Sequence, residues 1–308
     1  MVMARGTSHA PLLLSRLLPL ATTYCLLPTS YYQLPTSYFP LFTNPFPYPL
    51  NHYIFAMEFF DYFSDLYGER WPRLLEALKG EGRAMELRFG DGLEPYYLDE
   101  ASYFAASVLD ARPGMDVLDM CAAPGGKSLV IASMLQGQGS LQSNDRSPDR
   151  RLRLTHVLQN SLPAAWLEII KVTGYDGMKF GLHKKESYDR ILLDAPCSSD
   201  RHVLNSPAHL EVWSAKRVKR LSVEQGALLA SAVDALRPGG VLVYGTCALS
   251  PLENDKVVEK ILKKRPAMQV LPIDDVPPGA DRTEFGVHVL PDTSEGRGPI
   301  YCAKLAKN

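Results

Sequence analysis

The sequence predicts an α/β fold, a doubly wound and mainly parallel sheet of seven strands that follows a small helical N-terminal region. Two observations predict it. From residue 112 onward, short apolar runs that end in polar residues alternate with helical stretches, and such alternation is typical of parallel βαβ units. The 308-residue chain is also 46% hydrophobic, which is enough for a substantial core.

Seven apolar segments are the expected strands, and turn residues bound them. They are residues 117–119, 140–143, 167–172, 190–193, 241–244, 268–270 and 300–303. The expected helices between them are residues 127–135, 148–158, 216–236 and 253–263. A Pro-Gly-Gly turn at residues 238–240 separates the third of these helices from the strand that follows it.

Residues 58–111 come before this alternation and repeat apolar residues at three- and four-residue spacing, which indicates helices. The first helix contains Phe59 and Phe63, the second runs from Trp71 to Leu78, and the third opens at residues 98–102. We therefore expect residues 58–111 to form a small helical region and residues 112–308 to form the main domain.

Residues 1–57 differ in composition from the rest of the chain. They contain no Asp or Glu, and Arg5 and Arg16 are their only Lys or Arg residues. Their apolar stretch at residues 17–27 is too short to span a bilayer. Three interpretations stay open: an organelle transit peptide, a weak secretory signal, or a translation start at Met57. We favour the last and leave this segment out of the fold.

The net charge and the cysteine pattern argue against a globally basic nucleic-acid binder, a disulfide-bonded scaffold and a structural metal site. A net charge of -1 gives no global positive field, so a nucleic acid would have to be bound by local patches. Two candidate patches are residues 216–220 and the group Arg146, Arg150, Arg151 and Arg153, although a solvated helix face explains each equally well. The five cysteines include no CxxC pair, which argues against a disulfide framework or a structural metal and favours a reducing compartment.

Two cysteine-bearing turns follow predicted strands. Asp194-Ala195-Pro196-Cys197 follows the strand at residues 190–193, and Gly245-Thr246-Cys247 follows the strand at residues 241–244. In an open α/β sheet, ligands bind at the carboxyl ends of the strands. Two thiols and a carboxylate in that position indicate covalent chemistry on an electrophilic carbon.

A loop of small residues at 119–128 joins the first strand of the main domain to its first helix. Small residues let the backbone approach a ligand, and the helix N-terminus favours anionic groups. Asp145, Asp176 and Asp194 come at the ends of the next three strands, where carboxylates suit ribose hydroxyls and amines. These features predict a nucleoside cofactor with a cationic sulfonium. The alternative is that each Asp caps a helix.

Five ordered segments also carry a resemblance to a known family: residues 118–127, 144–150, 172–177, 194–199 and 244–254. They resemble the RNA cytosine-5 methyltransferases of the NOL1/NOP2/Sun type, over roughly residues 95–308. The details at residues 150, 176–177 and 200–202 look most similar to the mitochondrial rRNA branch and its bacterial relatives. The resemblance implies a Rossmann-like class I methyltransferase sheet and S-adenosylmethionine as cofactor.

The resemblance further implies roles for individual residues. Cys247 would be the nucleophile that adds to C6 of cytosine, and Cys197 would assist product release. Asp194 would hold N3 and the exocyclic amine of the base, while the nearby cation of Lys127 would keep Cys247 as a thiolate. The implied cofactor contacts are Cys121, Ala122, Ala123, Pro124, Gly125, Gly126, Lys127, Asp145, Arg150, Asp176 and Asp194, and no metal is expected.

An RNA substrate follows from the resemblance, with ribosomal RNA favoured over transfer RNA. The alternatives are a transfer-RNA cytosine-5 methyltransferase, a methyltransferase for exocyclic amines and a non-catalytic ribosome-assembly factor. Residues 58–111 are too few for a complete additional RNA-binding module, so the basic patches or a partner protein would bind the RNA. The bacterial cytoplasm is the expected location, with the mitochondrial matrix as the alternative, and no membrane contact is expected.

Overall fold

The computed structural model describes residues 50–308, with side chains from Met57 onward. Their main sheet has nine strands in the order β5-β4-β3-β6-β7-β11-β10-β9, with β8 beside β11. The strands are β3 (Asp116–Asp119), β4 (Ser140–Asn144), β5 (Ile170–Thr173), β6 (Tyr188–Asp194), β7 (Leu236–Thr246), β8 (Met268–Leu271), β9 (Asp281–Arg282), β10 (Val287–Val289) and β11 (Ile300–Lys307). Strands β3 to β7 are parallel, so the predicted mainly parallel sheet is confirmed.

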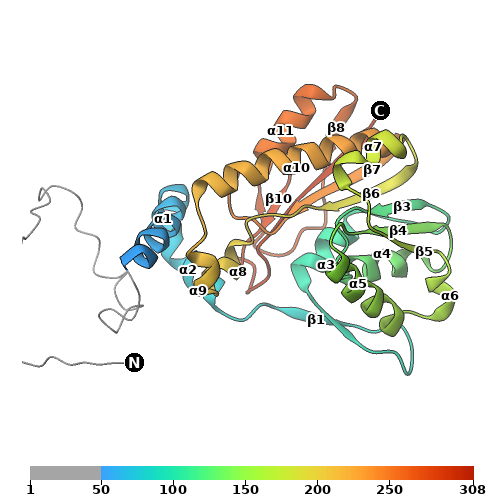
Figure 1. Ribbon diagram of the computed structural model, residues 1–308, viewed down its shortest axis with the longest axis horizontal. Coiled ribbons are helices and arrows are strands. Elements are labelled where there is room, and N and C mark those ends of the chain that lie inside the picture. The colour runs from blue at the N-terminus through green and yellow to red at the C-terminus, as the bar shows by residue number, and fades with distance from the viewer. Residues whose placement is uncertain (1–49) are drawn as a thin grey trace, which may run out of the picture. The chain divides into compact units, whose positions relative to one another are not determined.

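Helices cover both faces of this sheet, as Figure 1 shows for α3 and α4 on one side and α10 and α11 on the other. They are α3 (Glu100–Ser107), α4 (Gly126–Leu135), α5 (Pro148–Ser161), α6 (Ala164–Leu167), α7 (Phe180–His183), α8 (Asp200–Leu204), α9 (Pro207–Leu210), α10 (Ala215–Ala235) and α11 (Asp255–Lys264), with a 3-10 turn η3 (Gly177–Lys179) before α7.

Alternate residues of the central strands point to opposite faces and so build two hydrophobic cores. Val117, Leu192 and Val243 pack with α3, α4 and α5 in one core. Their neighbours Leu118 and Leu193 pack with α10 and α11 in the other. Two-sided burial is the reason why these strands read as continuous apolar runs in the sequence.

The structure differs from the expected strands in three places. The short antiparallel strands β9 and β10, which join β11, were not predicted because two or three residues are too few to show an alternating pattern. The chain at Leu167 is helical, and β5 begins only at Ile170. The predicted turn at residues 238–240 is a bulge inside β7, since Leu236 pairs with Tyr188 and Val241 already pairs with Arg190.

The N-terminal region contains the three predicted helices and one element that was not predicted. The helices are α1 (Leu50–Tyr67), α2 (Trp71–Lys79), which follows the 3-10 turn η2 (Gly68–Arg70), and α3. Strands β1 (Ala84–Leu87) and β2 (Tyr96–Asp99) form an antiparallel pair between α2 and α3. We expected helix throughout this region, but the aromatic residues of β2 favour a strand, and Asp99 caps α3 through bonds from the backbone N–H groups of Ala101 and Ser102.

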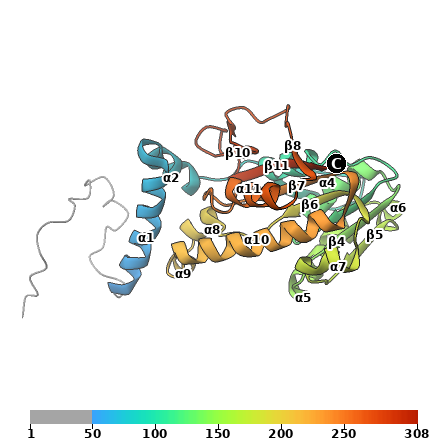
Figure 2. The ribbon, with the colours of Figure 1, turned by 90° about the horizontal axis from the view of Figure 1, so that it is seen from above.

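Helices α1 and α2 lie near α8 and α9 at one end of the described region (Figure 2). The aromatic rings of Phe59, Phe63, Trp71 and Trp213 pack together there and are fully buried. Helix α1 begins at Leu50, upstream of Met57. The other expectations for residues 1–57 fall on residues 1–49, which lie outside the described residues, and the division at residue 111 stays a prediction.

Among residues 50–308, no helix is both long and apolar enough to cross a membrane. In the same residues, no group of three or more His, Cys, Asp or Glu side chains is arranged to hold a metal ion.

Candidate active site

The predicted site residues follow the carboxyl ends of adjacent parallel strands. Strands β3 and β6 are neighbours at the centre of the sheet, and the chain order runs outward from β3 to β4 and β5 on one side and from β6 to β7 on the other. This reversal is the topological switch point where open α/β sheets bind their ligands. Asp119 ends β3, Asp194 ends β6, and Cys247 follows the end of β7.

The loop from Asp119 to Ser128 is packed between two other elements, and its glycines are required by that packing. A Cβ atom on Gly126 would lie 2.7 Å from Cδ1 of Leu98 in β2, closer than real Cβ contacts allow. Gly125 has a φ angle of +123°, and a Cβ atom on it would lie 3.1 Å from Cγ1 of Val157 in α5. Larger residues would therefore separate the loop from the β1–β2 pair or from α5.

Asp119, the first residue of this loop, bonds its last residue, Ser128. The side chain of Asp119 is fully buried, and Oδ2 accepts a 2.7 Å hydrogen bond from Ser128 Oγ at the start of α4. Burial raises the pKa of Asp119 to about 7. The sequence predicts Asp119 only as the first residue of the loop, with no role of its own.

A cavity of about 210 Å³ opens between this loop and the N-terminal region. Its lining residues are Tyr96, Leu98, Ser102, Asp119, Cys121, Ala122, Ala123, Pro124, Gly126, Lys127 and Asp194. Most of the residues predicted to contact the cofactor are therefore brought together around one cavity. Tyr96, Leu98 and Ser102 were missed, although the aromatic run before Asp99 is typical of a short strand and could have indicated that wall.

Asp145 and Arg150 lie outside the residues that line the cavity, but they are bonded to its loop. Arg150 Nη2 donates a 2.6 Å hydrogen bond to the carbonyl of Ala123, and its Nη1 lies 3.4 Å from Asp145 Oδ2. Asp145 Oδ1 accepts from the backbone N–H of Ser147 at 2.9 Å. Asp145 and Arg150 therefore lie at one edge of the loop at residues 119–128.

Asn144, at the end of β4, connects three of these segments. Its Nδ2 donates to the carbonyls of Met120 and Tyr175, both at 3.1 Å, and its Oδ1 accepts from the backbone N–H of Tyr175 at 2.8 Å. Asp176, the next predicted cofactor residue, accepts from the backbone N–H of Met178 at 3.1 Å and begins η3. Asp176 therefore caps η3, as the alternative explanation for these carboxylates predicts. A contact between Asp176 and the cofactor stays a prediction.

Lys127 and Asp194 form the central ion pair of the site. Lys127 Nζ donates to Asp194 Oδ2 at 2.7 Å and lies 3.4 Å from Ser102 Oγ. Burial disfavours the charge of Lys127, but the neighbouring carboxylate of Asp194 outweighs it and leaves the pKa of Lys127 above its ordinary value. Lys127 therefore stays a cation within the cavity wall.

The two predicted thiols are in contact. Sγ of Cys197 lies 2.9 Å from Sγ of Cys247, and Ser199 Oγ lies 3.6 Å and 3.5 Å from these two sulfurs. The hydrogen bond from Cys197 lowers the pKa of Cys247, with smaller contributions from Ser199 and Lys127, and the same bond raises the pKa of Cys197. The geometry therefore favours a thiolate at Cys247 and a protonated thiol at Cys197.

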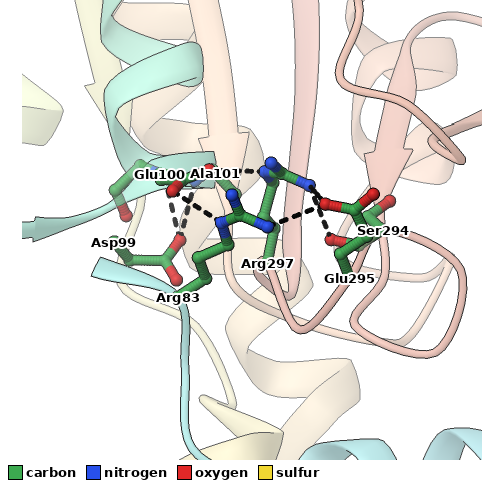
Figure 3. Close-up of polar contacts among 8 residues, drawn as sticks. Arg83, Asp99, Glu100, Ala101, Ser294, Glu295 and Arg297 are labelled. Atoms are coloured by element: carbon green, nitrogen blue, oxygen red, sulfur yellow. Dashed lines mark hydrogen bonds and ion pairs between the residues drawn. The ribbon is translucent and has the colours of Figure 1, made fainter. Parts of the chain in front are cut away.

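Charged residues hold the cavity's N-terminal wall in place, as Figure 3 shows. Glu100, the first residue of α3, accepts from Arg83 at 2.8 Å and from Arg297 at 2.6 Å. The same two arginines also bond Glu295, at 2.7 Å and 3.0 Å. This ring of four charges ties α3, which carries Ser102, to the segment before β11.

The two basic patches predicted from the sequence do not line the cavity. Residues 216–220 lie in the first turns of α10. In the other patch, Arg151 donates to the carbonyls of Asp145 and Arg146, at 2.8 Å and 2.9 Å, so its charge also has a local structural use.

Comparison with known proteins places this site in a family. The model of the family described as 16S rRNA methyltransferase RsmB/F matches residues 106–306. The chain belongs to the RsmB/F family. This membership confirms the resemblance to NOL1/NOP2/Sun RNA cytosine-5 methyltransferases that the five sequence segments carry.

Curated relatives of this RsmB/F family member come from animals and bacteria. A protein of Danio rerio named tRNA (cytosine(34)-C(5))-methyltransferase, mitochondrial, is 36% identical over 70% of this chain and 61% of its own length. A protein of Serratia proteamaculans named ribosomal RNA small subunit methyltransferase F is 35% identical over 72% of this chain and 48% of its own. The chain thus spans about half to three-fifths of the length of these relatives.

Solved structures agree with the family. NSun6 from Pyrococcus horikoshii, solved with SFG, has a TM-score of 0.58 and 30% identity, over 70% of this chain and 54% of its own. A methyltransferase homologue from the same organism has a TM-score of 0.66 over 85% of this chain and all of its own, and at 22% identity it supports the fold alone.

The expectation of S-adenosylmethionine as cofactor is confirmed at the level of the RsmB/F family, and this chain's residues fit that cofactor. Asp145 is 4% exposed, and its Oδ2 has no hydrogen-bond partner among the described residues. Its charged neighbour is Arg150, whose Nη1 lies 3.4 Å away, farther than in a good hydrogen bond. This buried oxygen can therefore still accept from a ligand donor, and the ribose hydroxyls of the cofactor are such donors. Ala122 and Ala123, whose side chains are small, line the cavity in which the same ligand would lie.

Proposed function

We propose that this chain is an S-adenosylmethionine-dependent RNA methyltransferase that makes 5-methylcytosine through a covalent bond between Cys247 and C6 of the base. The observation that carries the proposal is the contact between two thiols, 2.9 Å apart, at the ends of β6 and β7. The Lys127–Asp194 pair stands beside them on the wall of the cavity. The name of the Danio rerio relative states methylation at C5 of cytosine, and that of the Serratia proteamaculans relative states methylation of RNA; both support this proposal.

The chemistry requires each of these groups. C5 of cytosine is too weak a nucleophile to accept a methyl group unaided, and a thiolate added at C6 makes it enamine-like. Cys247 has the lowered pKa that this addition needs. The bound cofactor supplies an electrophilic methyl group. Transfer of the C5 proton to solvent water and expulsion of the Cys247 thiolate then restore the aromatic ring. The protonated thiol of Cys197 is in place to stabilise the departing thiolate through its hydrogen bond.

Asp194 and Lys127 would act on the far edge of the base. Asp194 Oδ2 is bonded to Lys127, and its side chain is 30% exposed, so the carboxylate can also accept from the exocyclic amine and from a protonated N3. Lys127 orients the Asp194 side chain through this bond, and it adds to the positive potential near Cys247. The stronger influence on the Cys247 thiol is its contact with Cys197 rather than Lys127.

Within this reaction we favour ribosomal RNA as the substrate, because the family description and the bacterial relatives are named for it. Transfer RNA is the second candidate, because the mitochondrial relatives from Danio rerio and Mus musculus are named for it at 36% identity. In either case the base must leave its stack to reach the Cys247 thiol, which is only partly exposed. A bacterial cytoplasm matches the bacterial relatives and a mitochondrial matrix the animal relatives, and a partner protein would deliver the RNA in either place.

Bisulfite sequencing of total RNA from cells with and without this protein tests the proposal. The proposal predicts one or a few cytosines that are protected in wild-type RNA and converted in the deletion strain. Protection in 16S-type rRNA supports the first substrate and protection in tRNA the second. Identical maps, with the protein expressed in the wild type, contradict the proposed activity.

A further inference from the structure

Two buried carboxylates, Asp200 and Glu253, join the two cysteine turns, and neither has a part in the chemistry proposed above. Both side chains are fully buried. Asp200 follows the Cys197 turn and begins α8, whereas Glu253 lies between the Cys247 turn and α11. Carboxylates are seldom buried without several hydrogen-bond donors to hold them.

The bonds of these two carboxylates are reciprocal. Asp200 Oδ2 accepts from the backbone N–H of Leu249, two residues after Cys247, at 2.8 Å. Glu253 Oε2 accepts from the backbone N–H of Ser198, the residue after Cys197, at 3.0 Å. Each turn therefore supplies a carboxylate that binds the backbone of the other turn.

Ser198 and Gln225 complete the connection. Ser198 Oγ donates to Asp200 Oδ2 at 2.8 Å, so Ser198 bonds both carboxylates. Gln225 Nε2, on α10, donates to Glu253 Oε2 at 2.8 Å and to the carbonyl of Pro196 at 2.9 Å. All four side chains are at most 1% exposed, so water does not compete for these bonds.

The second turn is also stiff within itself, so a shift at Leu249 would move Cys247. Asn254 Oδ1 accepts from Thr246 Oγ1 at 2.6 Å, and its Nδ2 donates to the carbonyl of Ala248 at 3.0 Å. Asn254 thus bonds both residues that flank Cys247 in the sequence, Thr246 and Ala248. The distance between the two sulfurs therefore depends on how the turns are held to each other.

We propose that Asp200 and Glu253 are positioning residues that hold the thiols of Cys197 and Cys247 in contact. They act through the backbone of the two turns and touch neither the base nor the cofactor. What Glu253 supplies is the acceptor Oε2, since its Oε1 has no hydrogen-bond partner among the described residues. Burial raises the pKa of Glu253 to about 7, in keeping with a role that needs an acceptor and not a charge.

Thiol–disulfide exchange measures this contact without RNA or cofactor. One glutathione disulfide takes two electrons from the Cys197 and Cys247 thiols and gives one protein disulfide and two reduced glutathiones. The equilibrium constant of this exchange equals the effective concentration that one cysteine thiol presents to the other. This effective concentration falls when the two thiols move apart. Peptide mapping of the full chain by mass spectrometry, after acid quenching, distinguishes this disulfide from any that involves another cysteine.

A matched set of variants separates positioning from charge. Glu253→Gln keeps an acceptor for Ser198 and Gln225, and we expect an effective concentration within about twofold of wild type. Glu253→Leu removes the acceptor. Asp200 Oδ1 accepts from Trp213 Nε1 at 3.3 Å and Oδ2 accepts from Leu249 and Ser198, so the NH2 group of Asp200→Asn would face a donor on either side. We expect each of these two variants to lower the effective concentration at least about tenfold. The control is Asp255→Asn, which alters a carboxylate on α11 whose bonds run to Tyr301 and Thr283, and it should leave the value unchanged.

The outcomes decide the inference. An effective concentration in folded Glu253→Leu or Asp200→Asn equal to wild type overturns it, as does a loss in Glu253→Gln as large as in Glu253→Leu. Should Glu253→Leu fail to melt cooperatively, Asp200→Asn carries the same test. The inference extends to catalysis only through the proposed function: Glu253→Leu should then lower kcat for methyl transfer and leave KM for RNA unchanged. Because the exchange assay needs no RNA, an inactive wild type contradicts the proposed function and leaves the positioning role intact.

Discussion

Lys127 Nζ lies 2.7 Å from Asp194 Oδ2, where the first turn of α4 meets the end of β6. The Lys127 side chain is only 14% exposed, so solvent screens this pair weakly. This ion pair therefore connects the loop at residues 119–128, which we expect to bind the cofactor, to the turn at residues 194–197, which carries Cys197.

Replacing Lys127 with Met should lower kcat for cytosine methylation about 100-fold to 1,000-fold, because Asp194 loses its partner and the Cys247 thiolate loses a nearby cation. Transfer of a radiolabelled methyl group to RNA measures it. Lys79→Met is the control, since it removes only the surface pair with Glu76, and surface pairs contribute little. A Lys127→Met enzyme within twofold of wild type would show that the pair has no catalytic part.

Asp145→Asn should weaken binding of S-adenosylhomocysteine by about tenfold or more. The amide keeps an acceptor for the backbone N–H of Ser147 but replaces the buried Oδ2 that we assign to the ribose, which accepts no hydrogen bond among the described residues and lies 3.4 Å from Arg150 Nη1. Isothermal titration calorimetry measures the affinity. Asp149→Asn, at an exposed position in the first turn of α5, is the control. Equal affinities for both variants would remove Asp145 from the cofactor site.

Gly126→Ala should destabilise the protein by about 1–3 kcal/mol, because its Cβ would lie 2.7 Å from Cδ1 of Leu98 and 2.8 Å from Cε1 of Tyr96. Gly226→Ala is the opposite case: nothing lies within 4 Å of its Cβ, and its position in α10 favours Ala by up to about 1 kcal/mol. Chemical denaturation measures both. The packing of β2 on the loop is contradicted if the two variants have the same stability.

Glu253 should make stability depend on pH. Burial raises its pKa from 4.5 to about 7, so the folded protein holds this proton more tightly than the unfolded chain. The resulting stabilisation is complete below the unfolded pKa and is lost as the pH rises through about 7. Glu253→Gln cannot ionise, and its free energy of unfolding relative to wild type should therefore increase from about pH 5 to about pH 8. Denaturant titrations at the two pH values measure this, and a constant difference contradicts the assignment.

Much of this fold and site could be predicted from the sequence, because the parallel strands are buried on both faces and end in polar residues. Cys197 and Cys247 are 50 residues apart in the chain, yet adjacent parallel strands bring their turns together, so their proximity was predictable from strand order alone. The wall of Tyr96 and Ser102 was not. Strand β2 is four residues long and is held by its partner strand β1, whereas α3, which carries Ser102, is bonded through Glu100 to the distant Arg297, and neither connection is visible in a local pattern.

The reciprocal bonds of Asp200 and Glu253 were equally hidden. A single sequence shows two acidic residues near two cysteines, and solvated carboxylates are the usual explanation. Their burial depends on which backbone N–H groups the turns leave without a partner, and that is a property of the assembled strands. Sequence patterns thus locate the reacting groups, whereas the groups that hold them emerge only from tertiary packing.

The covalent bond itself gives the most direct test of the proposed mechanism. Cys197→Ala and Cys247→Ala proteins are each incubated with unmodified target RNA and S-adenosylmethionine, and the products are digested and analysed by mass spectrometry. The mechanism predicts that Cys197→Ala accumulates a methylated cytosine nucleotide attached to the Cys247 peptide, and that Cys247→Ala gives neither adduct nor 5-methylcytosine. Full turnover by Cys247→Ala, or an adduct on a different residue, would contradict it.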